Sequence, residues 1–227
     1  MPTAASSIVG VIGMSCGESA RYSANYASLM NVVRPPGTIF ASVIGLSIAN
    51  NWNLIAQSFL QSEAEWLFLV NDDHVYSPDI LSKLLAHNVD IVTGLYLGRS
   101  FPHMPIIYDE VDNIGRTFPR YLADGEKGLI PIKACGDGCL LIRRKVLETI
   151  PYPWWDLGQL SIVSCDHDLS FSKKVREAGF QIYCDFGATV GHIACMTVMP
   201  QQNENGQWGT FLLQGTNVIA IPSPQTV

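Results

Sequence analysis

The sequence predicts an α/β domain built around a mostly parallel, Rossmann-like sheet with helices on both faces. Short apolar segments of strand length alternate with segments in which apolar residues recur at helical spacing. Such alternation favours parallel strands that are joined by helical crossovers. Hydrophobic residues make up 48% of the 227 residues and charged residues 15%, as expected for a chain with a sizeable buried core.

The alternation is clearest in the first half of the chain. A Pro-Pro-Gly sequence at 35–37 ends the first helical segment, and a Ser-Pro-Asp sequence at 77–79 begins the third. Asn50 or Asn51 can cap the second helical segment. In chain order we expect a strand at 7–14, a helix at 19–33, a strand at 38–44, a helix from about 50 to 60, a strand at 66–70, a helix from 77 and a strand at 90–95.

The second half of the chain is less regular. Gly136, Asp137 and Gly138 interrupt it before an apolar strand, and the proline-rich segment 151–155 must be a loop. Gly179 is expected to cap the last helix at its C-terminus. The expected elements are strands at 103–108, 130–135 and 139–142, helices at 143–150 and 166–178, and short strands at 180–184 and 188–193.

The length predicts one domain, by a rough prior of about 150 residues per domain. We place this domain at 1–200 and a polar C-terminal tail at 201–227. Part of the tail is expected to dock on the domain through Trp208 and the apolar residues 211–213.

No apolar run approaches the roughly 18 residues that a spanning helix needs. No basic segment precedes an apolar core at the N-terminus, so we expect a cytoplasmic protein without a membrane span.

Charge and cysteine content exclude two further classes. The net charge of −6 argues against a broad electrostatic contact with nucleic acid. The six cysteines lack CxxC spacing, and we expect them to be reduced and mostly buried thiols that form neither disulfides nor a zinc site.

The apolar run at 66–70 ends abruptly in Asn71, Asp72, Asp73 and His74. Burying unpaired carboxylates is costly, so the two aspartates should lie where the strand leaves the sheet. In open α/β sheets ligands bind at that edge. Two adjacent oxygen donors there suit a magnesium or manganese ion that also holds phosphate oxygens. The alternative is a strand-to-helix turn whose acids only cap the helix that follows.

Four segments in order resemble the nucleotide-sugar-dependent glycosyltransferases of the GT-A fold, particularly the family-two-like group. VNDDHVYSPD at 70–79 is similar to a strand that ends in a DxD motif, and IVTGLYLGR at 91–99 is similar to the strand that follows it. GDGCLLIRRKVLETIPYPWW at 136–155 resembles a Gly-x-Gly strand, a short helix and a Pro-aromatic loop. CDHDLSFSKKVREAGFQIYCD at 165–185 resembles the family's acidic helix, with Gly191 and His192 beyond it.

The resemblance implies a GT-A fold with a nucleotide-binding half at about 1–98 and an acceptor half at about 99–200, including a smaller β region on the acceptor side. It implies the transfer of a sugar from a nucleotide-sugar donor, most often a UDP-sugar, to an acceptor hydroxyl. The acceptor could be a glycan, a protein or a hydroxylated nucleobase in DNA. The implied cofactor is Mn²⁺, or Mg²⁺, on the donor diphosphate.

The resemblance also assigns roles to individual residues. Asp73 and His192 would bind the metal, Asp72 would reach the ribose or a metal-bound water, and Asp166 would be the general base. A lone histidine is more often structural, and acids at a helix start often serve as caps. Asp168 is therefore expected to be a cap or a supporting residue.

The remaining assignments each have an equally ordinary alternative. Asn53 matches an asparagine near the nucleotide, but it could be a surface amide. Gly136 and Asp137 would approach a sugar closely, or they form an ordinary turn. Trp154 could form an apolar platform for a sugar or acceptor, or it could pack in the core.

The chain departs from the family pattern at two positions. Asn71 replaces the first acid of DxD, and Cys165 replaces a glutamate that commonly precedes the base. These departures keep a non-catalytic nucleotide- or sugar-binding module open as an alternative. A nucleotidyltransferase is a further alternative, because it would share the sheet, the acids and the metal. It normally needs a basic Gly-rich loop after the first strand, and the absence of lysine and arginine from residues 13–17 argues against it.

Overall fold

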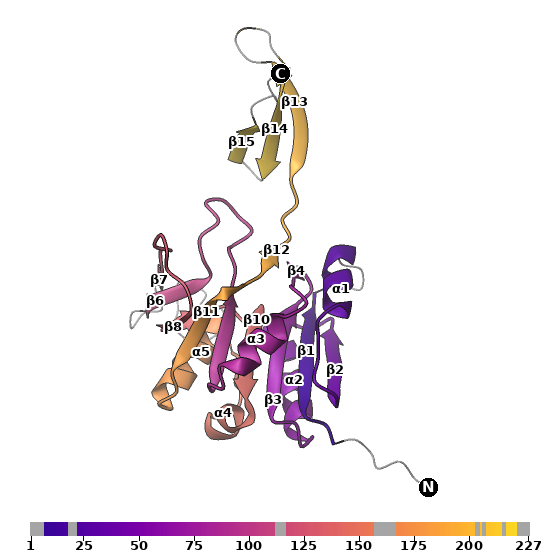
Figure 1. Ribbon diagram of the computed structural model, residues 1–227, viewed down its shortest axis with the longest axis vertical. Coiled ribbons are helices and arrows are strands. Elements are labelled where there is room, and N and C mark those ends of the chain that lie inside the picture. The colour runs from indigo at the N-terminus through magenta and orange to yellow at the C-terminus, as the bar shows by residue number, and fades with distance from the viewer. Residues whose placement is uncertain are drawn as a thin grey trace.

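A seven-stranded sheet forms the centre of the computed structural model, which describes residues 7–17, 22–111, 117–156, 167–202, 205, 208–214 and 217–221. The strand order is β2-β1-β3-β10-β5-β11-β8 (Figure 1). These strands are β1 (Gly10–Cys16), β2 (Thr38–Ile44), β3 (Trp66–Asn71), β5 (Ile91–Leu95), β8 (Leu129–Ile132), β10 (Cys139–Arg143) and β11 (Ile182–Thr189). Pairs β1–β2, β1–β3 and β5–β11 are parallel, whereas β10 and β8 run antiparallel to their neighbours. The predicted mostly parallel α/β fold is confirmed.

Helices cover both faces of this sheet. One face packs against α2 (Ile48–Leu60), α4 (Arg144–Thr149) and α5 (His167–Glu177), and the other against α1 (Ser23–Met30) and α3 (Ile80–Ala86). Strand β3 shows why its sequence is apolar throughout. Leu67 and Leu69 enter the first core, while Trp66, Phe68 and Val70 enter the second. A strand that is buried on both faces cannot alternate apolar and polar residues.

The carboxyl ends of β1, β3 and β5 meet at one edge of the sheet, together with the amino end of β10. Beyond this edge, β4 (His74–Val75) pairs with β12 (Gly191–His192), so that His192 lies opposite His74. This short pairing joins two segments that are far apart in the sequence and creates the candidate site.

Two smaller sheets complete the structure. Strands β6 (Ile107–Val111), β7 (Thr117–Pro119) and β9 (Ala134–Cys135) form one of them, beside the half of the central sheet that contains β8 and β11 (Figure 1). Strands β13 (Thr197–Gln202), β14 (Trp208–Gln214) and β15 (Asn217–Ile221) form the other, which stands off the main body. The sequence did not predict these last strands. Gln214 connects them to the body, because its side-chain amide donates to the backbone carbonyl of Arg99.

Several boundaries differ from the prediction for local reasons. Helix α2 begins before Asn50, because the Ser47 hydroxyl accepts the Asn50 N–H at 3.3 Å and caps the helix. Asn51 is instead buried and donates to the Ser15 hydroxyl at 3.0 Å. Gly179 has φ +88°, as a C-terminal helix cap requires.

Among the helices that the structure describes, none is long and apolar enough to span a bilayer.

Candidate functional site

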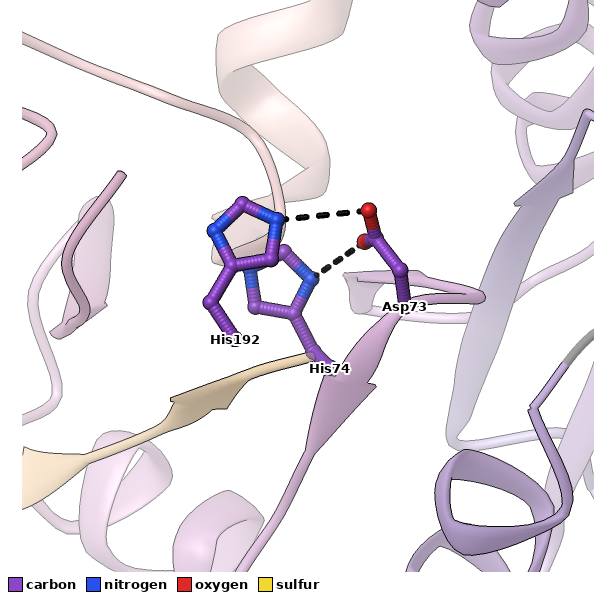
Figure 2. A group of neighbouring side chains, drawn as sticks. All are labelled: Asp73, His74 and His192. Carbon is purple, nitrogen blue, oxygen red and sulfur yellow. Dashed lines mark hydrogen bonds and ion pairs between the residues drawn. The ribbon is translucent and has the colours of Figure 1, made fainter. Parts of the chain in front are cut away.

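The Asp73 carboxylate lies at the centre of the candidate site and is surrounded by three nitrogen-bearing side chains. His74 Nδ1 lies 2.9 Å from Asp73 Oδ1, and His192 Nε2 lies 3.2 Å from Asp73 Oδ2 (Figure 2). Arg99 Nη1 donates to the same Oδ2 at 3.0 Å. The two imidazoles stack with their centroids 4.2 Å apart. The strand exit predicted from the sequence is therefore a cluster of one acid, two histidines and one arginine.

The tautomer of His192 follows from its second contact. Its Nδ1 lies 2.8 Å from the Leu97 carbonyl oxygen, which can only accept, so Nδ1 carries the proton. In the neutral ring, Nε2 then presents a lone pair to a carboxylate oxygen. Two lone pairs at hydrogen-bond distance repel each other unless a proton or a metal ion lies between them. Histidine ligands of metals commonly donate their other N–H to a backbone carbonyl in this way.

The spacing of these atoms fits a metal ion. An octahedral ion with bonds of about 2.1 Å holds neighbouring ligand atoms about 3 Å apart. Asp73 Oδ2 and His192 Nε2 are 3.2 Å apart, and the ligand atoms of Asp73, His74 and His192 all lie within 4.8 Å of one another. A ligand set of one carboxylate and one imidazole favours manganese over magnesium.

His74 fits a positioning role better than a ligand role. Its Nε2 is buried and has no hydrogen-bond partner among the described residues. If Nδ1 bound a metal, the proton would be on Nε2, and an unpaired buried N–H costs about 1–3 kcal/mol. Burial also lowers the pKa of His74, so the ring is neutral at neutral pH. We therefore expect Nδ1–H to donate to Asp73 and to hold its carboxylate in place.

The environment keeps Asp73 ionised. Burial raises the pKa of its carboxyl, but the hydrogen bonds with His192 and His74 lower it by more. The net result is a pKa far below the ordinary value for an aspartate. A carboxylate that is always charged at neutral pH is available as a metal ligand.

Backbone contacts fix the turn that presents Asp72 and Asp73. The Asn25 side chain donates to the carbonyls of Asn71 at 2.8 Å and His74 at 2.7 Å. The Gly17 N–H, at the exit of β1, donates to Asp72 Oδ2 at 3.0 Å. Asp72 thus points to the β1 side of the site and Asp73 to the β12 side. The two adjacent acids therefore face different neighbours.

The segment Gly136–Asp137–Gly138 lies against the same cluster. A Cβ atom on Gly138 would be 2.8 Å from His74 Cε1, and one on Gly136 would be 2.2 Å from the Tyr96 hydroxyl oxygen. Both positions therefore exclude larger residues. Asp137 is buried, and its Oδ2 lies 3.0 Å from His167 Nε2. The predicted sugar-binding segment thus adjoins the predicted metal residues, and its sugar contacts stay a prediction.

Asn53 and Trp154 lie in the interior. Asn53 Oδ1 accepts the backbone N–H groups of Trp154 at 3.0 Å and Trp155 at 3.2 Å, and Asn53 Nδ2 donates to the Trp155 carbonyl at 2.7 Å. Trp154 belongs to the core, and its indole N–H donates to the Leu147 carbonyl at 2.9 Å. These contacts favour the core alternative for Trp154. Asn53 is buried, so it is not the surface amide of the alternative, and its nucleotide contact stays a prediction.

Replacing Asn53 with alanine is expected to destabilise the protein by about 2–4 kcal/mol, because two buried N–H groups and one carbonyl lose their partner. Chemical denaturation measures the loss. The exposed neighbour Leu54 provides a control, since Leu54→Ala on the same helix should change the free energy of unfolding much less. A stable Asn53→Ala variant with weakened nucleotide binding would instead support the original assignment.

The predicted base, Asp166, and Cys165 lie outside the described residues. The described part of the segment begins with helix α5 at His167. Asp168 lies in the first turn of this helix, where its Oδ1 accepts the Leu169 N–H at 2.8 Å. The contact is consistent with the expected supporting role of Asp168.

Sequence reasoning missed Arg99 and the positioning role of His74. Arg99 was the last residue of the segment IVTGLYLGR, but nothing in that segment marks an arginine as a partner of Asp73. His74 directly follows the two acids, and this adjacency was the available signal. Both roles depend on side-chain directions, which the sequence does not show.

Comparison with known proteins identifies the fold. No protein-family model and no curated protein sequence matches the chain. The structure is similar to that of A197 from STIV, with a TM-score of 0.58, 14% identity and coverage of 95% of this chain and 98% of that one. It is also similar to GalNAc-T7, which was solved with UDP, GalNAc and Mn²⁺, with a TM-score of 0.53, 8% identity and coverage of 83% of this chain and 44% of that one.

A third similar structure is S. aureus TarS, with a TM-score of 0.50, 12% identity and coverage of 82% of this chain and 36% of that one. The chain therefore spans less than half the length of the GalNAc-T7 and TarS chains. Identities this low show the fold alone. The chain has the GT-A glycosyltransferase fold, as the four sequence landmarks predicted.

Proposed function

We propose that this chain, which has the GT-A fold, transfers a sugar from a nucleotide-sugar donor to an acceptor hydroxyl with the help of a divalent cation. The observation that carries the proposal is the geometry of Asp73 and His192. The Nδ1–H of His192 donates to the Leu97 carbonyl, and its Nε2 faces the ionised Asp73 carboxylate at 3.2 Å. This arrangement lies at the sheet edge where α/β folds bind ligands.

Asp73 and His192 would hold the cation, and His74 would orient Asp73. When bound, the cation would neutralise the charge that develops on the departing diphosphate. Asp72 points to the β1 side, where it can accept hydrogen bonds from the donor ribose or from a water. Asp137, on the other side of the cluster, would accept hydrogen bonds from sugar hydroxyls.

The acceptor hydroxyl must lose its proton during the reaction, and Asp166 is the proposed base. It immediately precedes helix α5, whose first residue His167 contacts Asp137. We propose Mn²⁺ as the cation and UDP as the nucleotide, since the similar GalNAc-T7 structure contains both. Glycans, proteins and hydroxylated nucleobases remain the acceptor classes to screen.

The protein is expected to bind UDP more tightly with Mn²⁺ than without it, and His192→Gln is expected to lose at least about tenfold in Mn²⁺ affinity. Glutamine fills a similar volume but offers no imidazole nitrogen. Isothermal titration of Mn²⁺, and then of UDP with and without Mn²⁺, measures both effects. His87→Gln is the matched control, because His87 contacts an aspartate, Asp185, at 2.8 Å outside the cluster.

Equal UDP affinity with and without Mn²⁺ would contradict the metal-bridged donor. Wild-type Mn²⁺ affinity in His192→Gln would contradict the ligand role of His192. A circular dichroism melt of each variant shows whether a loss of binding reflects a loss of structure.

A non-catalytic sugar- or nucleotide-binding module is the second candidate, because Asn71 removes one charge from the expected metal site. The two functions differ in turnover. Release of UDP from a UDP-sugar in the presence of Mn²⁺ and a panel of hydroxylated acceptors supports the enzyme. Tight metal-dependent binding without release of UDP over the whole panel supports the binding module.

A further inference from the structure

Among the described lysines and arginines, Arg99 contacts the acid of the cluster. Its Nη1 lies 3.0 Å from Asp73 Oδ2, the same oxygen that faces His192 Nε2. The Asp73 side chain is 10% exposed, whereas the Arg99 side chain is 55% exposed. The pair therefore joins a buried carboxylate to a guanidinium whose side chain can swing out into solvent.

The backbone that carries Arg99 is held by its own hydrogen bonds. Leu97 forms a β-bridge with Pro105, and the Gly98 N–H donates to the Met104 carbonyl at 2.8 Å. His103 Nδ1 donates to the Gly98 carbonyl at 2.9 Å. The Leu97 carbonyl also orients His192. One loop thus fixes the imidazole and places the guanidinium two residues later, while the guanidinium itself remains half-exposed.

Most other cationic side chains of the described residues pair with acids away from this cluster. These pairs are Lys83–Asp79, Arg120–Asp109, Arg120–Glu126, Arg144–Glu148, Lys145–Asp90, Lys173–Glu177 and Lys174–Asp156. Within the described part of the chain, Arg99 is the arginine or lysine that pairs with Asp73. Among the described residues, Arg99 is thus the guanidinium that contacts a proposed metal residue and would be near a diphosphate bound at the cluster.

We propose that Arg99 occupies the cation position on Asp73 until a divalent ion binds, and then turns to the diphosphate of the donor. This inference rests on the proposed function, because it needs a diphosphate at the cluster. It adds a diphosphate-binding residue and an order of events: the ion displaces Arg99 from Asp73, and the displaced guanidinium then binds the phosphate oxygens.

The order follows from electrostatics. A divalent ion on Asp73 Oδ2 and His192 Nε2 would lie beside the Arg99 guanidinium, and the two positive charges would repel each other. The ion also neutralises the carboxylate that held Arg99. A diphosphate that bridges the ion then offers oxygen atoms in the geometry that a guanidinium binds best, through two parallel N–H donors.

Arg99→Gln tests both halves of the proposal with probes other than activity. The variant is expected to bind Mn²⁺ alone at least about threefold more tightly than wild type, because a competing positive charge is gone. In saturating Mn²⁺ it is expected to bind UDP about 10- to 100-fold more weakly, because a charge-assisted contact is lost. Arg99→Lys keeps the positive charge but lacks the two parallel N–H donors of a guanidinium. It should give Mn²⁺ affinity near wild type and intermediate UDP affinity.

Arg143→Gln is the matched control. Arg143 donates to the Asn88 side chain at 3.2 Å and lies at the opposite edge of the sheet, beside the start of β3. It should leave both affinities unchanged. Inorganic pyrophosphate, titrated in the same way, tests whether the Arg99 effect belongs to the diphosphate and not to the nucleoside.

Weaker Mn²⁺ binding by Arg99→Gln, or UDP affinity equal to wild type, overturns the role of Arg99 while leaving the proposed function standing. Failure of the wild-type protein to bind Mn²⁺ or UDP overturns both proposals together. A fall in pyrophosphate and UDP affinity by the same factor, with a gain in Mn²⁺ affinity, is the result that supports the proposal.

Discussion

Asp73→Asn is expected to abolish Mn²⁺-dependent UDP binding and to lower the rate of sugar transfer at least about 100-fold, because a metal that polarises a leaving group is worth several kcal/mol. The substitution removes the charge at the centre of the cluster and keeps the size of the side chain. Three groups now contact this carboxylate: His74, His192 and Arg99. An amide oxygen is a poorer ligand than a carboxylate, and the amide nitrogen would face either the Nδ1–H of His74 or the guanidinium of Arg99, which are both donors.

Two measurements separate this effect from a general loss of structure. Mn²⁺ titration by electron paramagnetic resonance reports the metal directly, and thermal unfolding reports the fold. Asp79→Asn is the control in the same segment, because Asp79 is an exposed acid that pairs with Lys83 outside the cluster. Metal-dependent UDP binding that survives in Asp73→Asn would move the metal site elsewhere. Asp72 would then be the next acid to test.

The contrast between Asp73 and Asn53 shows what the sequence can and cannot predict about the site. Asp73 was predictable because its position is local: an apolar strand ends, and the next polar residues must lie at the sheet edge. For Asn53 the motif match identified a residue type without its direction. Its amide turns inward and binds the backbone at Trp154 and Trp155, more than one hundred residues away.

The fold was predictable to a similar extent. The second strand, expected at 38–44, has these bounds in the structure, and the apolar run of β3 is buried on both faces. The insertion of β10 between β3 and β5, antiparallel to both, is not visible in local patterns. It depends on pairing between distant segments. The β4–β12 pairing that brings His192 to Asp73 also joins distant segments. Only the family resemblance indicated that His192 lies at this site.

Asp166→Asn is expected to lower the rate of transfer by about 100- to 10,000-fold, the usual contribution of a positioned base, while UDP and Mn²⁺ affinities stay at wild-type values. The amide keeps the size of the side chain and its ability to accept hydrogen bonds. It cannot take the proton of the acceptor hydroxyl. Single-turnover transfer with saturating donor measures the chemical step apart from binding.

Asp168→Asn is the control variant for this experiment. Asp168 lies two residues away in the same acidic segment, and its carboxylate contacts the backbone N–H of Leu169 at 2.8 Å. Its replacement should lower the free energy of unfolding more than the rate of transfer. If instead Asp166→Asn transfers sugar at nearly the normal rate, the chain does not use this base, as in a mechanism that retains the anomeric configuration. NMR of the product anomer then distinguishes the two mechanisms, because a base that activates the acceptor for direct displacement must invert the anomeric centre.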